Sequence, residues 1–424
     1  MNTLIDPENT TVLPTVEDVV RAQMRLRDVV TKTPLLHNFN LSQQYDSEIF
    51  LKREDLQVVR SYKIRGAYNK ISSLGEERSK GVVCASAGNH AQGVAYACQR
   101  MGIKGVIFMP SPTPSQKVKQ VRMFGKDQVE VVLKGDTFDD AYYAAMEYCK
   151  ANDSVFIHPF DDPKVIEGQG TVGMEILEET SQPIDYLFVP IGGGGLSAGV
   201  GSYFKQISPA TKIIGVEPAG AAGMKASLEK GEVVTLPKID KFVDGAAVQR
   251  VGEKTFEICR QVLDDVISVP EGKVCSTILK LYNEEAIVVE PAGALTISAL
   301  DYYKDQIKGK RVVCVVSGSN NDIVRMEEIK ERSLLFEGLK FYFIIRFPQR
   351  AGALRDFLVN VLGPKDDIVH FEYTKKINRE KGPALVGLEV ESPEDFNKLT
   401  ERMSEKNIQY ELLNERFDLF NFLI

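Results

Sequence analysis

Three loops of small and polar residues each follow an apolar run of the kind that forms a buried strand. They read SAGNHAQG at 86–93, PIGGGGLSAG at 190–199 and SGSN at 317–320. Four successive glycines leave backbone N–H groups unobstructed before a helical stretch, so this loop could wrap a phosphate. The loop at 86–93 also opens a helical stretch, whose first N–H groups could receive a carboxylate. Together the loops predict a site for a small anionic ligand.

Each loop also has a structural interpretation. A glycine-rich turn can simply close a connection, Asn89 can be an ordinary helix cap, and SGSN taken alone is a turn. The glycines lack the GxGxxG spacing with an acidic ribose ligand, and no Gly-Lys-Ser/Thr follows, so dinucleotide and P-loop sites fit poorly. A ligand site is favoured because loops at the carboxyl ends of strands converge on one crevice of an α/β sheet.

One lysine, Lys63 in SYKIRGAYNK, lies between an aromatic ring and a guanidinium group. A lysine is far more often a solvated surface charge than a catalyst. Its amine can, however, form a Schiff base with a carbonyl, and an aldehyde cofactor with a phosphate could use the glycine loop as a handle. Pyridoxal phosphate carries both groups, so Lys63 is a candidate nucleophile.

Alternating strands and helices would have to position these loops. Apolar runs near residues 81, 104, 128, 154, 185, 212 and 310 predict strands, and segments after 90, 137 and 164 have a helical period. A further helix is predicted to begin near Thr15, which has capping-box spacing with Asp18. The alternation predicts a mostly parallel sheet with helices on both faces.

The pattern changes after about residue 333. Strand-like segments are predicted at 339–347, 367–375, 384–390 and 408–413, with helical segments at 350–363 and 393–406. The order β-α-β-β-α-β is typical of a ferredoxin-like domain. We therefore expect two domains, 1–333 and 338–424, with KERS at 330–333 as the linker.

Composition narrows the classes of function. A net charge of -7 and a pI of about 5.5 weigh against a nucleic-acid partner. The N-terminus has no signal-like segment and no apolar run approaches the roughly 20 residues that span a bilayer, so we expect a cytoplasmic protein without membrane contact. Six cysteines are scattered singly, which predicts buried free thiols. No metal ligand is assigned; Glu217 is a weak cation candidate, and Glu290 is expected to be structural.

The motifs SYKIRGA, SAGNHAQG, GGGGLSAG and SGSN, in this order, resemble those of the fold type II pyridoxal-phosphate enzymes. The resemblance covers roughly residues 15–330 and is greatest to the threonine dehydratases, whose ACT-like regulatory domain resembles the C-terminal module. It implies a tryptophan synthase β-like catalytic region of two α/β subdomains, followed by an α+β ferredoxin-like domain.

The resemblance also implies residue roles. Lys63 would hold pyridoxal 5'-phosphate covalently and later act as a base, and Ser317 would face the pyridine nitrogen. The residues implied to bind the phosphate are Gly192, Gly193, Gly194, Gly195 and Leu196. Asn89 would form a hydrogen bond with the pyridoxal 3-oxygen. The substrate carboxylate would be received by Ser86, Ala87, Gly88 and Asn89, with His90 beside them. Tyr62 departs from the expected phenylalanine, and its hydroxyl needs a partner.

The implied reaction converts L-threonine into 2-oxobutanoate and ammonia, the first step of isoleucine biosynthesis. The implied effectors are isoleucine as inhibitor and valine as its opponent, acting at RAGAL (350–354), unless that domain only mediates assembly. A homo-oligomer is implied, as a homotetramer or a dimer, and the apolar tail 417–424 is expected to pack on protein. Alternatives are a catabolic threonine or serine dehydratase, serine racemase, cysteine synthase, a non-catalytic amino-acid sensor and a nicotinamide oxidoreductase.

Overall fold

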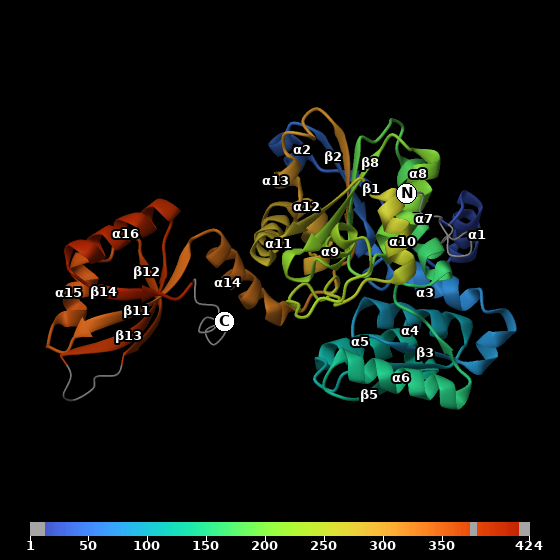
Figure 1. Cartoon of the computed structure of the whole chain (residues 1–424), viewed down its shortest axis with the longest axis horizontal. Coiled ribbons are helices and arrows are strands. Elements are labelled where there is room, and N and C mark those ends of the chain that lie inside the picture. Colours follow the sequence, from blue (N-terminus) through green and yellow to red (C-terminus); the bar gives the residue numbers. More distant parts are fainter. Residues whose placement is uncertain (1–12, 374–379, 415–424) are drawn as a thin grey trace, which may run out of the picture. The chain divides into compact units, whose positions relative to one another are not determined.

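The computed structural model describes residues 13–373 and 380–414. The chain divides into two compact units, Met1–Glu271 with Leu281–Asp322, and Gly272–Lys280 with Ile323–Ile424 (Figure 1). The first 12 residues and the apolar tail at 417–424, which is expected to pack on protein, lie outside the described residues.

The first unit contains a six-stranded sheet in the order β1-β2-β10-β7-β8-β9. Only the β1–β2 pair is antiparallel. The strands are β1 (Leu35–His37), β2 (Glu48–Arg53), β7 (Tyr186–Pro190), β8 (Lys212–Pro218), β9 (Asp265–Val269) and β10 (Arg311–Val316). The predicted strands near 185, 212 and 310 are therefore confirmed, and they lie side by side at the centre of this sheet.

A second, fully parallel sheet has the order β5-β4-β3-β6. Its strands are β3 (Val82–Ala85), β4 (Gly105–Met109), β5 (Val129–Leu133) and β6 (Val155–Phe156). The sequence pattern suggested one sheet, and that expectation was wrong, because an apolar run does not reveal which other strand it pairs with. The two α/β subdomains implied by the resemblance are confirmed.

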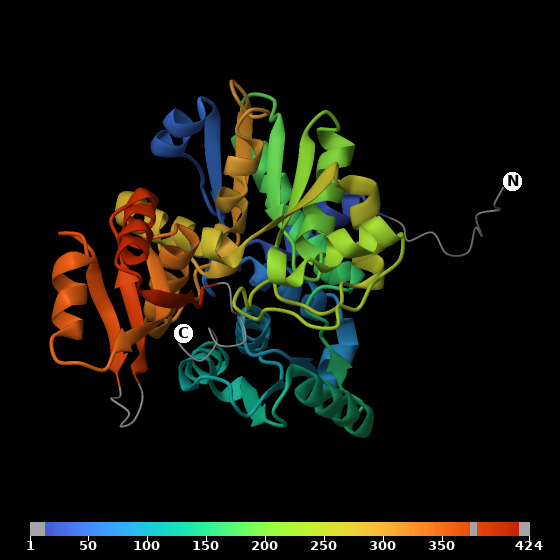
Figure 2. The same cartoon turned by 60° about the vertical axis from the view of Figure 1, so that its left-hand side comes forward.

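Helices cover both faces of this second sheet (Figure 2). Val82 and Ile107 pack with one set of helices, and Val83 and Phe108 pack with α6 on the opposite face. The helices of the unit are α1 (Val16–Leu26), α2 (Phe39–Tyr45), α3 (Lys63–Ser72), α4 (Asn89–Met101), α5 (Ser115–Gly125), α6 (Phe138–Asn152), α7 (Pro163–Glu179), α8 (Gly195–Ile207), α9 (Gly223–Lys230), α10 (Glu253–Val262), α11 (Glu271–Glu285, which continues into the second unit), α12 (Pro291–Ser298) and α13 (Leu300–Tyr303). The predicted capping box of α1 is present between Thr15 and Asp18. All six cysteines are buried and free, as predicted.

Helices α3 and α7 cross with their backbones nearly in contact. A Cβ atom built on Gly168 of α7 would lie 2.6 Å from the Arg65 carbonyl oxygen and 2.8 Å from the Gly66 Cα. Glycine is the residue that allows such an approach. The crossing fixes α3, which begins at Lys63, against α7.

The second unit has the predicted β-α-β-β-α-β order. Its antiparallel sheet runs β12-β13-β11-β14. The elements are β11 (Lys340–Pro348), α15 (Ala353–Asn360), β12 (Asp367–Tyr373), β13 (Lys381–Glu389), α16 (Pro393–Glu405) and β14 (Gln409–Leu412). The expected linker at 330–333 was wrong: it lies within helix α14 (Met326–Phe336), whose sequence contains no glycine or proline to end a helix.

Candidate active site

Lys63 is the first residue of α3, and its amine lies away from any carboxylate partner. Nζ donates to the Pro159 carbonyl at 2.9 Å, and the described residues provide no ion pair for it. The Tyr62 ring centroid is 5.4 Å from Nζ. Burial lowers the pKa of Lys63 to about 8, although the Glu290 carboxylate partly opposes this shift. The neutral, nucleophilic form of this amine is thus far more populated near pH 7 than it is for an ordinary lysine.

The glycine loop lies beside the segment that holds this amine. It connects β7 to α8, and Gly194 has a φ of +91°, a conformation that favours glycine. A Cβ atom on Gly193 would lie 2.3 Å from the ring of Phe160, the residue after Pro159. Thr255 Oγ1 holds the loop by donating to the Gly193 carbonyl at 2.6 Å. The first N–H groups of α8, from Gly195 onward, have no acceptor within the helix and could bind a phosphate.

The loops at 86–93 and 317–320 meet through the side chain of Asn89. Its Oδ1 accepts a hydrogen bond from Asn320 Nδ2, and its Nδ2 donates to Glu290 Oε1 at 2.7 Å. Asn320 Nδ2 also donates to the Val59 carbonyl at 3.0 Å. These bonds join the start of α4, the loop after β10 and the chain entering α3.

Ser317 directly follows strand β10 and is buried next to the lysine segment. Its carbonyl accepts from the Tyr62 N–H at 3.2 Å, and Ser61 forms a β-bridge with Gly318. The structure therefore brings Lys63, Asn89, the glycine loop and Ser317 into one region, although the loops follow strands of two different sheets.

The remaining predicted site residues form the turn before α4. Ser86 Oγ accepts from the Gly88 N–H at 3.2 Å, and a Cβ atom on Gly88 would meet no atom within 4 Å, so there is open space beside Gly88, whereas Ala87 packs against the core of this subdomain. His90 differs from its neighbours because its Nε2 contacts the Ile157 carbonyl at 2.8 Å. Burial lowers the pKa of His90 to about 3, so this ring is neutral. Its proposed contact with substrate stays a prediction.

Glu290, which we expected to be structural, is part of this region. It directly precedes α12, is buried, and receives the Asn89 amide. Burial and the nearby Asp244 raise its pKa to about 7, against a smaller opposing effect of the Asn89 bond. In the sequence, the only local feature that could have pointed to a special role of Glu290 is its position directly before Pro291. Glu217 also directly precedes a proline, so this feature does not distinguish the two glutamates.

Glu217 has a different environment from the cation site that we had considered. Its two carboxylate oxygens accept from the N–H groups of Met224 at 2.7 Å and Lys225 at 2.9 Å, at the start of α9. Within residues 13–373 and 380–414, no group of three or more His, Cys, Asp or Glu side chains could hold a metal ion. The carboxylate acts as a buried helix cap.

Comparison with known proteins agrees with this geometry. Residues 26–318 match the family described as pyridoxal-phosphate dependent enzymes, and residues 331–423 match the C-terminal regulatory domain of threonine dehydratase. Two relatives named L-threonine dehydratase biosynthetic IlvA, from Halalkalibacterium halodurans and Bacillus subtilis, are each 60% identical over 410 residues, which is 96% of this chain and 99% and 97% of theirs. The chain belongs to the pyridoxal-phosphate-dependent threonine dehydratase family.

Solved structures show the same relationship for the catalytic unit. The processed form of threonine deaminase isoform 2 from Solanum lycopersicum has a TM-score of 0.71 and 40% identity, covering 78% of this chain and 99% of its own. Maize serine racemase also has a TM-score of 0.71, with 32% identity over 76% of this chain and 98% of its own. The fold type II architecture is therefore confirmed.

The residues of this threonine dehydratase family member fit the family's cofactor. Pyridoxal phosphate needs an amine that can be neutral, which Lys63 provides, and a cradle for its phosphate. The loop at 192–195 offers that cradle, because side chains there would fill it or clash with Phe160 and Ala246. No helix in the described part of the chain is long and apolar enough to cross a membrane.

The regulatory domain contains a cavity of about 380 Å³ at the turn between β11 and α15. Its walls include the apolar side chains of Phe347, Leu354, Leu358 and Phe371, with Arg350 and Arg355 at the same turn. Gly352 has a φ of +83° and precedes α15. The RAGAL segment named from the sequence thus lines a hollow with both apolar and cationic surface.

Proposed function

We propose that this enzyme is a biosynthetic L-threonine dehydratase that converts L-threonine into 2-oxobutanoate and ammonia at the start of isoleucine biosynthesis. The observation that carries the proposal is the Lys63 amine, which is held by a carbonyl, has a lowered pKa and lies beside the glycine loop. The names of the relatives and the attached regulatory domain support this substrate.

The chain's own residues would have distinct roles in binding and proton transfer. When bound, pyridoxal phosphate supplies an electron sink for the substrate's Cα. Lys63 would bind the cofactor through its neutral amine and then take the Cα proton. The first N–H groups of α8 would hold the phosphate. The Ser86–Asn89 turn would orient the substrate by its carboxylate.

Ser317 would set the outcome of the reaction. It offers a neutral hydroxyl at the predicted position of the pyridine nitrogen, and a hydroxyl cannot hold that nitrogen protonated as a carboxylate would. Negative charge would therefore be less well stabilised on the ring, which favours rapid loss of the β-hydroxyl over transamination.

Steady-state assays of the purified holoenzyme test the function. We expect 2-oxobutanoate from L-threonine with a higher kcat/KM than pyruvate from L-serine. Faster formation of D-serine than of either 2-oxo acid would favour the alternative of a serine racemase, whose maize homologue has a similar fold. Binding of amino acids without any turnover would favour a non-catalytic sensor.

For regulation, we propose that isoleucine inhibits by binding the cavity of the C-terminal domain and that valine opposes it. The apolar walls suit a branched side chain, and the arginines with the N–H groups of α15 suit a carboxylate. Leu354→Ala should weaken inhibition by isoleucine, because Leu354 lines the cavity. Val359→Ala is the matched control, since Val359 lies on the same helix, is 72% exposed and does not line the cavity. Equal inhibition of both variants would contradict this site and favour a domain that only mediates assembly.

We further propose that the enzyme is a cytoplasmic homo-oligomer, with a homotetramer favoured over a dimer. Light scattering of the full chain and of a chain ending before residue 417 would measure the assembly and the contribution of the tail. A monomer at micromolar concentration would contradict the proposal.

A further inference from the structure

A directional chain of hydrogen bonds ends at the buried carboxyl group of Glu290. Asn320 Nδ2 donates to the Val59 carbonyl and to Asn89 Oδ1, and Asn89 Nδ2 donates to Glu290 Oε1 at 2.7 Å. From Asn320 to Glu290 each amide presents its amino group to the next acceptor, whereas the bond to the Val59 carbonyl points the other way and anchors Asn320. The chain therefore begins at the Asn320 amino group and ends at a carboxylate.

The chemistry of its two neighbours fixes the orientation of the Asn89 amide. An ionised carboxylate can only accept hydrogen bonds, so Asn89 must turn its amino group toward Glu290. Asn320 Nδ2 can only donate, so it requires the Asn89 oxygen on the other side. An amide nitrogen carries two protons, and one Asn89 N–H remains for a further acceptor.

Glu290 occupies a place where a charged group is costly. It is 4% exposed, and within the described residues it forms no ion pair. A Cβ atom on Gly318 would lie 2.5 Å from Glu290 Oε1, so glycine leaves the room that this carboxyl group fills. Its charged and titratable neighbours are Asp244, Lys117, Lys63 and Tyr62. A glutamine would have nearly the same shape without a charge to desolvate.

We propose that Glu290 is a positioning residue, which acts through Asn89 to aim one amide N–H at the ring oxygen of the bound cofactor. The proposal rests on the proposed function, because it assigns that N–H to the cofactor. A buried acid kept at a site despite its cost is more often explained by function than by stability.

A role of Glu290 in positioning and a role in stabilising the fold predict opposite effects of Glu290→Gln on stability. Burial raises the pKa of Glu290 to about 7, above the ordinary value of 4.5. The folded state therefore binds this proton more tightly than the unfolded state does. The contribution of Glu290 to stability is fully present below about pH 4.5 and is lost as the pH rises through about 7. At pH 8 the ionised carboxylate costs stability, so Glu290→Gln should melt at a higher temperature than the wild-type apoenzyme.

Glu290→Gln should nevertheless impair the holoenzyme, because the glutamine amide can present either its oxygen or its amino group to Asn89. We expect kcat to fall roughly tenfold, as expected for loss of one orienting interaction of about 1.4 kcal/mol. The visible absorbance of the lysine-bound cofactor should depend on pH near 7 in the wild type, and this dependence should be lost in Glu290→Gln.

Glu217→Gln is the matched control. Both glutamates lie in the hexapeptide Val-Glu-Pro-Ala-Gly-Ala, both are buried, and burial raises both pKa values to about 7. Glu217 instead caps α9 through the Met224 and Lys225 N–H groups. Glutamine has one acceptor oxygen in place of two, so Glu217→Gln weakens this cap, while kcat and the visible absorbance should stay unchanged.

A double-mutant cycle separates positioning from packing. If Glu290 acts through Asn89, the effect of Glu290→Gln on the absorbance should disappear in an Asn89→Ala background. A Glu290→Gln enzyme with wild-type kcat, wild-type absorbance and a lower melting temperature at pH 8 would overturn the proposal. A coloured wild-type enzyme that forms no 2-oxo acid from threonine would instead refute the proposed function, while the absorbance cycle and the melting temperatures would still decide the role of Glu290.

Discussion

Two cationic side chains of helix α3, two residues apart, are in opposite electrostatic situations. The Lys63 amine donates to one carbonyl oxygen and has no carboxylate partner within the described residues. Arg65 is 0% exposed, and all of its N–H groups have acceptors. The same helix thus holds a saturated charge and an uncompensated one.

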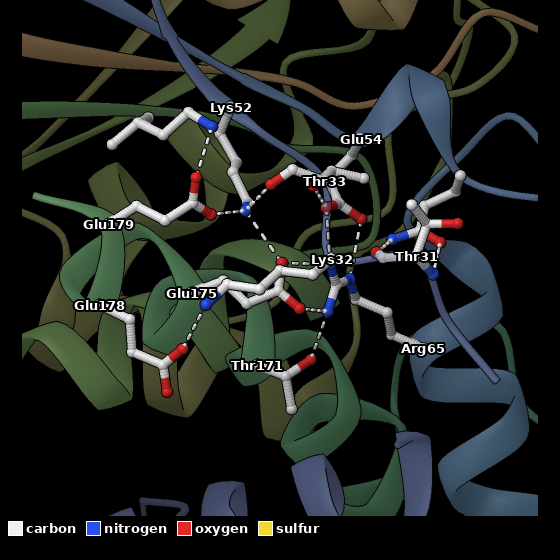
Figure 3. A network of polar contacts seen from close by, with 12 residues as sticks. Thr31, Lys32, Thr33, Lys52, Glu54, Arg65, Thr171, Glu175, Glu178 and Glu179 are labelled. Carbon is white, nitrogen blue, oxygen red and sulfur yellow. Dashed lines mark hydrogen bonds and ion pairs between the residues drawn. The ribbon is translucent and has the colours of Figure 1, made fainter. Parts of the chain in front are cut away.

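The Arg65 network joins three elements (Figure 3). Its guanidinium group forms bidentate bonds with Glu54, after β2, and with Glu175, on α7, and donates to Thr171 at 3.1 Å. Lys52 of β2 pairs with the same Glu175 at 2.9 Å and with Glu179 at 3.0 Å. Pairing of this geometry can compensate for the loss of hydration of buried charges.

The contrast shows how pairing decides the protonation of buried groups. Burial alone would raise the pKa of Glu175, but Arg65 and Lys52 more than offset it, so its pKa lies below the ordinary value. Burial shifts Lys63 and Glu290 toward their neutral forms, because neither forms an ion pair within the part of the chain that the structure describes. Groups that stabilise the fold stay charged here, and groups at the site can exchange protons near pH 7.

The largest effect should come from removing the uncompensated amine. Lys63→Ala should reduce turnover at least about a thousandfold, the size expected from loss of a proton-transfer group, and abolish the visible absorbance of the bound cofactor. At pH 7 the Lys63→Ala apoenzyme should melt at no lower temperature than the wild-type apoenzyme, because the substitution removes an amine that is costly to bury. Lys70→Ala on the same helix, which removes an ion pair with Asp162, should retain activity. Turnover of Lys63→Ala that is close to the wild-type value, or retention of the visible absorbance, would contradict the assignment.

Breaking the saturated network should affect stability. Arg65→Met leaves Glu54 and Glu175 buried without their partner and should lower the free energy of unfolding by about 3–5 kcal/mol. Urea denaturation of the apoenzyme measures this loss. Arg21→Met removes an exposed ion pair with Glu17 and should change little. Similar losses for the two variants would mean that the network is not compensated as its geometry indicates.

The pH dependence of stability should have opposite signs in the two regions. The lowered pKa of Glu175 gives stability that is present above about pH 4.5 and is lost as the pH falls below it. The difference in melting temperature between the wild type and Glu175→Gln should therefore shrink on acidification. The difference between the wild type and Glu290→Gln should grow as the pH rises through 7. If the two differences in melting temperature changed with pH in the same direction, the proposed contrast between the two regions would be wrong.

The smallest effect should come from one bond of the network. Thr171→Val keeps the shape of the side chain but leaves one Arg65 N–H without its acceptor, which should cost about 1–3 kcal/mol. Urea denaturation again provides the measurement, with unchanged kcat as the control for the site. A stabilising effect would show that the hydroxyl contributes nothing to the network.

The central strands and the loops that follow them could be predicted because each is a local pattern. The runs that became β3, β4, β7, β8 and β10 are short, apolar and followed by turn residues. Strand β2 was missed, since EIFLKR contains charges, and one of them is the buried Lys52. That burial depends on Glu175 and Glu179, more than 120 residues away along the chain.

The site was predictable only where motifs mark it. The hexapeptide Val-Glu-Pro-Ala-Gly-Ala occurs at 216–221 and again at 289–294. In the first copy the glutamate lies within a strand, and in the second it precedes a helix and contacts Asn89. Identical local sequences with different surroundings cannot be told apart without the tertiary structure, which explains why Glu290 was assigned a structural role.

The crossing at Gly66 and Gly168 matters for protein engineering. Replacing helical glycines by alanine is a routine way to build heat-tolerant enzymes, because alanine restricts the unfolded chain. At Gly168 the added methyl group would press on the backbone of the helix that begins with Lys63. A library designed on helix propensity alone would therefore include Gly168→Ala, which would displace the reactive amine. Variants with this change would lose catalytic activity without becoming more heat-tolerant.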